Sequence, residues 1–165
     1  MSTPTPPERP AAGRTVDLDD TDHRILAELR ADGRMSMRTL AERVHISRAS
    51  AYNRVQRLEQ RGVITSYTAV IDPERAGYGI SAFIYLKVSQ HSWKTIRQHV
   101  MDIPEVWQAA LVAGDHDLVL LIRVRDTQTL RDLVLARLQT LPGVVSTQTA
   151  LVLDEIPQER VVPAP

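Results

Sequence analysis

The 165-residue chain contains no cysteine, only two lysines and a single phenylalanine. Without cysteine it has no disulfide scaffold, no thiol nucleophile and no cysteine-ligated zinc site. No apolar run approaches the ~20 residues of a membrane-spanning helix, so we expect no membrane partner. A charged and apolar leader is also missing from the N-terminal region, which favours a cytoplasmic location. The length permits one ordinary domain or two small ones.

Net charge is zero, with 20 basic and 20 acidic residues, but the charges are unevenly distributed. Between Ser47 and Gly62 a single acid, Glu59, accompanies four arginines. These arginines are Arg48, Arg54, Arg57 and Arg61. A local basic patch is what a nucleic-acid partner requires, whatever the average charge.

The first part of the chain has the pattern of a small helical domain. Residues 1–16 are rich in proline and poor in apolar residues, so we expect a disordered tail. Apolar residues at three-to-four spacing then predict three helices, near 18–31, 37–44 and 47–61. Ser36 and Ser47 are suitable N-caps for the second and third. The short connection between these two helices predicts a helix-turn-helix, in a domain spanning residues 17–66.

The second part changes from helical to mixed periodicity. Extended pieces are expected at 63–64 and 67–71, with residues 67–79 forming a linker strand or hinge. Strands are then predicted at 81–88, 106–113, 118–124 and 144–153, and helices at 93–101 and 127–141. This order is the split βαβ arrangement of a ferredoxin-like domain, here assigned to residues 80–156, with a tail at 157–165. The fold class is therefore α+β, and one apolar sheet face is left for a partner.

The third helix carries the residues expected to contact DNA. If Ala51, Val55 and Leu58 face the core, the helical wheel turns several polar and basic residues outward. The candidate DNA-binding residues are Ser47, Arg48, Ser50, Asn53, Arg54 and Arg57. Small side chains permit close approach, Asn53 suits an adenine edge, and the arginines suit guanine or phosphate. The alternative is that this arginine-rich face is merely solvated.

A second candidate site is the tight turn Gly114-Asp115-His116-Asp117 between two apolar strands. It has the residues that hairpin turns prefer, which is the simpler interpretation. It also places backbone N–H groups and carboxylates where they could hold the two poles of a free amino acid. The five histidines show no metal-ligand spacing, and no catalytic motif is present. We therefore expect no catalytic residue, no metal and no cofactor.

Several stretches together resemble the Lrp/AsnC, or feast/famine, family of transcriptional regulators. They are LDDTDHRILAELRADGRMSMRTLAERVHIS, NRVQRLEQRGVITSYTAVID, VAGDHDLVLLIRV and LPGVVSTQTALVLDE, and they span about residues 17–156. The resemblance implies a winged helix-turn-helix joined to a ferredoxin-like effector and assembly domain. It implies dimers built by the C-terminal sheets, often assembled into octamers, with an amino acid or similar metabolite bound between protomers.

The resemblance also carries over to single positions. Ser47, Arg54, Arg57 and Leu58 match the recognition-helix pattern. Gly114 and Asp117 match the family's effector turn, and Thr147 and Thr149 match its final strand. Together with Asp115 and His116 of the same turn, these are the candidate effector-binding residues. Two positions depart from the family pattern. His45 stands where glycine is usual and positive φ is expected, and His116 replaces an aromatic residue, so effector identity transfers poorly.

Three functions compete on this sequence. The first is a sequence-specific regulator that binds operator DNA and responds to an amino acid. The second is an enzyme on the same scaffold, such as a tetrapyrrole decarboxylase of the sirohaem type, which needs no basic helix surface. The third is a structural or metabolite-buffering assembly. The arginine-bearing helix favours the regulator.

Overall fold

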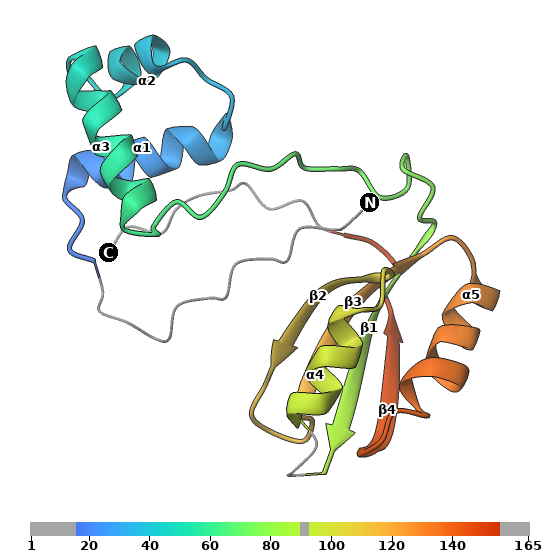
Figure 1. The fold of residues 1–165 in the computed structure, drawn as a ribbon. Coiled ribbons are helices and arrows are strands. Elements are labelled where there is room, and N and C mark those ends of the chain that lie inside the picture. The colour runs from blue at the N-terminus through green and yellow to red at the C-terminus, as the bar shows by residue number, and fades with distance from the viewer. Residues whose placement is uncertain (1–15, 90–92, 156–165) are drawn as a thin grey trace. The chain divides into compact units, whose positions relative to one another are not determined.

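The computed structural model describes residues 16–89 and 93–155, and the chain divides between Ala69 and Val70 into two units. We call the described parts of these units the helical domain and the sheet domain (Figure 1). None of the helices in the described ranges is long and apolar enough to cross a lipid bilayer.

The helical domain contains α1 (Asp20–Ala31), α2 (Met37–Arg43) and α3 (Arg48–Gln60). Side chains of Asp19, Ser36 and Ser47 accept backbone N–H groups at the three helix starts, which confirms the two predicted serine caps. The buried apolar residues form one cluster, made of Ile25, Leu29, Met35, Leu40, Val44, Val55 and Leu58. Full burial of each large aliphatic side chain contributes roughly 1.5–3 kcal/mol, so packing fixes the orientation of α3.

The connection between α2 and α3 depends on a left-handed residue. His45 has φ 58°, and Ile46 N–H donates to the Ala41 carbonyl at 3.0 Å. The positive φ expected at this position is confirmed. Histidine adopts it without glycine's freedom, so the sharp turn is retained at some cost in backbone strain.

The segment after α3 differs from the prediction. The pieces expected to be extended at 63–64 and 67–71 form no strand, and residues 61–79 have no ladder partner. Instead the Tyr67 hydroxyl donates to Glu59 of α3 at 2.9 Å. Burial and this carboxylate neighbour raise the pKa of Tyr67 to about 12. Alternating apolar residues alone did not create a strand, because no neighbouring strand is available to pair with them.

The sheet domain has the predicted ferredoxin-like topology. Its elements are β1 (Ile80–Val88), α4 (Trp93–Met101), β2 (Val106–Leu111), β3 (Leu118–Val124), α5 (Thr127–Asp132), η1 (Leu133–Leu138) and β4 (Val144–Leu151). All strand pairs are antiparallel, in the order β2-β3-β1-β4. Helices α4 and α5 cover one face of the sheet (Figure 1).

The two sheet faces differ in their cover. Alternate residues of β1 and β3, such as Ile84 and Leu120, are fully buried against the helices. On the other face, Phe83 and Trp107 are each 40% exposed. The Arg123 guanidinium lies 4.6 Å from the Trp107 ring centroid and pairs with Glu155 at 3.0 Å. This second surface, which we call the open face, is apolar and uncovered in the single chain, as predicted.

The last helix is not the uniform helix predicted for 127–141. Its second half, η1, is a π-helix, in which Gln139 N–H donates to the Val134 carbonyl five residues back. The wider turn lets both Leu133 and Leu138 lie in the core, while Ala136, expected to face inward, is exposed. In a regular α-helix, residues five positions apart point in clearly different directions, so Leu133 and Leu138 would not both face the core.

Candidate nucleic-acid interface

Helix α3 is presented outward by its own apolar stripe. Ala51, Val55 and Leu58 are buried, while Arg48 and Asn53 are exposed. In the described part of the chain, Arg48 has no hydrogen-bond or ion-pair partner. The N-terminal half of α3 therefore offers a guanidinium and an amide that are both free to meet a ligand.

Ser47 and Ser50 are linked at the start of α3. The Ser47 Oγ accepts the Ser50 N–H at 3.1 Å, and this capping bond fixes the first turn. Ser47 is exposed and Ser50 is half-buried. These small side chains leave the helix start sterically open, as a close approach to DNA requires.

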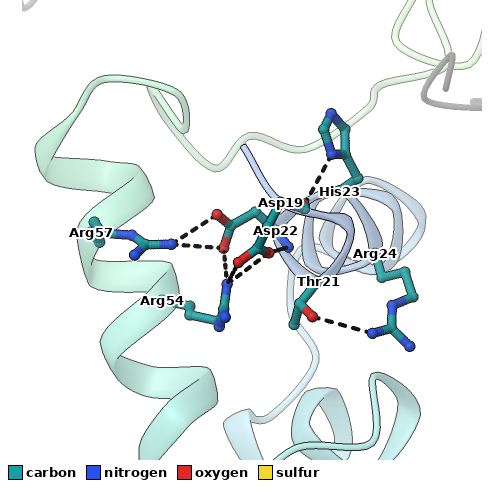
Figure 2. Close-up of polar contacts among 7 residues, drawn as sticks. All are labelled: Asp19, Thr21, Asp22, His23, Arg24, Arg54 and Arg57. Carbon is teal, nitrogen blue, oxygen red and sulfur yellow. Dashed lines mark hydrogen bonds and ion pairs between the residues drawn. The ribbon is translucent and has the colours of Figure 1, made fainter. Parts of the chain in front are cut away.

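Arg54 and Arg57 are engaged by acids of α1 (Figure 2). Arg54 Nη1 donates to both oxygens of Asp19, at 2.8 and 2.7 Å, and to Asp22 Oδ1 at 2.7 Å. Arg57 Nη2 donates to the two Asp22 oxygens, at 3.1 and 2.8 Å. The two carboxylates thus join the start of α1 to the second half of α3, and we call Asp19 and Asp22 the carboxylate clamp.

The carboxylate clamp changes the electrostatics predicted from the sequence. Hydrogen bonds from Arg54 lower the pKa of Asp19, and the same contacts raise the pKa of Arg54. Asp19 and Arg54 therefore stay charged at neutral pH. The basic patch predicted for residues 47–62 is partly neutralised, since two of its four arginines face carboxylates from another helix.

Sequence reasoning did not find the role of Asp22, although a signal was present. Leu18, Asp22, Ile25 and Leu29 lie at the spacing of one helix face, so Asp22 occupies an apolar stripe. In the structure it is 1% exposed. A carboxylate buried in this way requires cationic partners, and arginines on α3 supply them.

The turn predicted to bind an effector is tied to its own sheet. Asp117 Oδ2 accepts the Val88 N–H at 2.8 Å, and Asp117 N–H donates to the Leu86 carbonyl at 2.9 Å. Lys87 Nζ lies 3.7 Å from Asp117 Oδ1. Asp117 therefore fixes the turn against β1, which is the structural role that the simpler interpretation assigned to this segment.

The other turn residues are more available. Gly114 has φ 139°, and no atom lies within 4 Å of where its Cβ would be, so the backbone there is open. Asp115 is exposed. The His116 ring packs against Tyr85, with centroids 5.2 Å apart. Since Tyr85 alternates with the buried residues of β1, His116 lies over the open face of the sheet.

The predicted residues of β4 lie apart from the turn. Thr147 pairs with Leu86 and Thr149 with Ile84, which puts both side chains on the helix-covered side of the sheet. Gln139 Nε2 donates to Thr147 Oγ1 at 2.8 Å, consistent with this placement. Within one described chain, no hydrogen bond or ion pair joins these threonines to residues 114–117.

Two family models match the chain, one over each domain. The model described as a winged helix-turn-helix DNA-binding domain matches residues 18–65. The model described as the Lrp/AsnC ligand binding domain matches residues 81–162. Each match begins close to the first described helix or strand of its domain.

Relatives and solved structures match over most of their length. The HTH-type transcriptional regulator AldR of Mycolicibacterium smegmatis is 35% identical over 91% of this chain and 90% of that protein. The leucine-responsive regulatory protein of Escherichia coli is 36% identical over 87% of this chain and 90% of its own length. Among solved structures, the chain is similar to the Neisseria meningitidis regulator NMB0573 in complex with L-methionine. The two sequences are 30% identical, the TM-score is 0.84, and the match covers 89% of this chain and 97% of the Neisseria chain.

Proposed function

The chain belongs to the Lrp/AsnC family of transcriptional regulators, and on this premise we propose that the N-terminal half of α3 recognises operator DNA. The observation that carries this proposal is the outward presentation of Arg48 and Asn53 by a buried stripe, beyond a capped and sterically open helix start. Asn53 suits an adenine edge, and Arg48 suits guanine or phosphate. Ser47 and Ser50 bring the backbone close to the groove.

Arg54 and Arg57 complete the proposed interface in a different way. Each guanidinium uses one terminal nitrogen for the carboxylate clamp, so its remaining N–H groups can still donate to phosphate or a base. In a dimer, two such helices would contact two half-sites of the operator. These half-sites would be separated by ~34 Å, which is one turn of the DNA helix, or by a multiple of that distance.

DNA titrations with single variants test this proposal. A duplex selected by the chain from a random-sequence pool serves as the operator. Arg48→Ala should weaken its binding roughly 5- to 10-fold, and Asn53→Ala should change base preference more than affinity. Arg131→Ala, which removes an exposed arginine from the sheet domain, is the charge-matched control. Equal affinities for all three variants would refute the assignment of α3.

For the effector we propose a free amino acid held at residues 114–117. Asp115 is exposed and Gly114 leaves its backbone open, which suits the ammonium and carboxylate poles of such a ligand. We retain Asp117 and His116 as walls of the pocket, together with Thr147 and Thr149 as predicted from the sequence. The L-methionine complex of the Neisseria regulator supports this ligand class.

Thermal shift with methionine, leucine and alanine tests the effector proposal. A bound amino acid should raise the melting temperature of the wild-type protein, and Asp115→Ala should abolish that rise without altering the apo protein. If none of the three amino acids stabilises the protein, the ligand class is wrong.

The proposed assembly is a homodimer formed through the open face, with octamers as the higher form, in the cytoplasm. Phe83 and Trp107 supply the apolar surface for this contact. Phe83→Glu should convert the dimer to monomer in sedimentation velocity. An unchanged dimer would exclude the open face as the dimer interface.

We further propose that the protein is not an enzyme. The tetrapyrrole decarboxylase is not favoured, because the relatives that match both domains are named as regulators.

A further inference from the structure

The buried acid of the helical domain cannot itself contact DNA. Asp22 is 1% exposed, and both of its oxygens accept hydrogen bonds from arginines of α3. Its backbone N–H donates to Asp19 Oδ1 at 2.8 Å, so the two carboxylates are also fixed to each other. Any influence of Asp22 on DNA binding must therefore act through Arg54 and Arg57.

The contacts leave part of each guanidinium unused. Arg54 makes all three of its bonds through Nη1, and Arg57 makes both of its bonds through Nη2. Within the described residues, the other terminal nitrogen and Nε of each side chain have no acceptor. The side chains are 26% and 48% exposed, so part of each remains accessible to solvent.

Fixing a guanidinium at one nitrogen limits the directions in which its other donors can point. A free arginine side chain loses much of its rotamer entropy when a contact immobilises it. A guanidinium already held by carboxylates has lost much of that entropy before DNA arrives. The same carboxylates reduce the net positive charge that drives binding to any phosphate backbone.

We propose that the carboxylate clamp is the positioning element of the DNA interface: Asp22, assisted by Asp19, orients Arg54 and Arg57 toward the operator and restrains their non-specific attraction to phosphate. This inference rests on the proposed function of α3. It differs from a purely structural role, in which the ion pairs only attach α1 to α3. The two roles make different predictions for specificity and for salt dependence.

The main experiment compares Asp22→Asn with Glu28→Gln in the full chain. Glu28 is a matched control, because it also lies on α1 and also pairs with an arginine of the helical domain, Arg43, at 2.8 Å. Binding is titrated at several salt concentrations, on the selected duplex and on a scrambled one. Asp22→Asn should lower the ratio of specific to non-specific affinity at least 5-fold and steepen the logarithmic salt dependence by about one unit or more. Glu28→Gln should leave both quantities unchanged.

Asp19→Asn covers the case in which Asp22→Asn does not fold. Asparagine is as good an N-cap as aspartate, so α1 should keep its start, while Arg54 loses one of its two carboxylates. We expect a smaller drop in the specificity ratio, about 2- to 3-fold, again with a steeper salt dependence. Circular dichroism checks the folding of each variant.

The outcomes distinguish the positioning role of the carboxylate clamp from the proposed DNA binding by α3. If Arg48→Ala weakens binding but Asp22→Asn and Asp19→Asn match Glu28→Gln in ratio and salt slope, the positioning role is wrong and the ion pairs are structural only. If Arg48→Ala also has no effect, the assignment of α3 as the DNA-contacting helix fails as well.

Discussion

The two domains hold the acids of their candidate sites in different ways. In the helical domain, Asp19 and Asp22 face guanidinium groups, and the one added backbone bond runs from the Asp22 N–H to Asp19. In the sheet domain, the nearest partner of Asp117 is a backbone N–H of β1 at 2.8 Å, and its ion pair with Lys87 is longer, at 3.7 Å. A side-chain ion pair can exchange one anion for another, including a phosphate, whereas a backbone bond holds a turn in one shape. The first arrangement suits an adjustable surface, and the second suits a fixed pocket wall.

The largest expected effect tests whether the two domains are independently stabilised. Leu58 and Leu120 are each fully buried, in separate clusters. Replacement of either by Ala should cost about 2–5 kcal/mol in its own domain. Both tryptophans lie in the sheet-domain part of the sequence, so their fluorescence follows that domain while circular dichroism also follows the helices. Equal shifts of both signals in both variants would show a single cooperative unit.

A second prediction concerns the backbone-held acid. Asp117→Ala removes the acceptor of the Val88 N–H and should destabilise the sheet domain by roughly 1–2 kcal/mol. Asp115→Ala, two residues earlier in the same turn, should change stability by less than about 0.5 kcal/mol. Denaturant titration followed by tryptophan fluorescence measures both. Equal losses would mean that Asp117 does not fix the turn.

A third prediction compares how the domains make a left-handed residue. The turn between β2 and β3 uses Gly114, whereas the turn between α2 and α3 uses His45. His45→Gly should relieve backbone strain and stabilise the helical domain by up to about 1 kcal/mol. The greater conformational entropy of glycine in the unfolded chain offsets part of this gain. His45→Ala keeps the strain and should give no gain. A loss of stability in the glycine variant would indicate that the histidine ring makes a needed contact.

The smallest expected effect is a difference between the two domains in how their stability depends on pH and salt. Arg54 lowers the pKa of Asp19, and the Thr129 N–H lowers that of Asp126, the N-cap of α5. Both acids therefore add stability that is present above the ordinary aspartate pKa of about 3.9 and is lost as pH falls through their lower folded values. Added salt should reduce the contribution of Asp19 more than that of Asp126. Acid titrations of Asp19→Asn and Asp126→Asn at two salt concentrations measure the difference; equal salt sensitivity would contradict it.

Local features of the fold could be predicted well from the sequence. The caps at Ser36 and Ser47, the buried stripe of α3 and the order of strands and helices each follow from short-range patterns of residue type. Positive φ at His45 could also be predicted, from the resemblance to a family in which glycine is usual there. These features depend on neighbours within one or two helical turns.

The misses arise from contacts between distant residues. The partners of Arg54 and Arg57 lie more than 30 residues away, and a helical wheel of α3 alone cannot find them. Residues 63–71 have strand-like composition, yet they lack a pairing strand. The position of Asp22 on an apolar stripe was one signal of long-range pairing that the sequence did contain.

The wide turn of η1 has a consequence for how related chains are aligned. A π-turn is what a helix forms when it accommodates one extra residue without disturbing the contacts on either side. Leu133 and Leu138 would keep their inward positions in a chain that is one residue shorter between them, now wound as an unbroken α-helix. A related chain with a single-residue deletion at this point would therefore change helical pitch locally and keep the sheet contacts of both leucines.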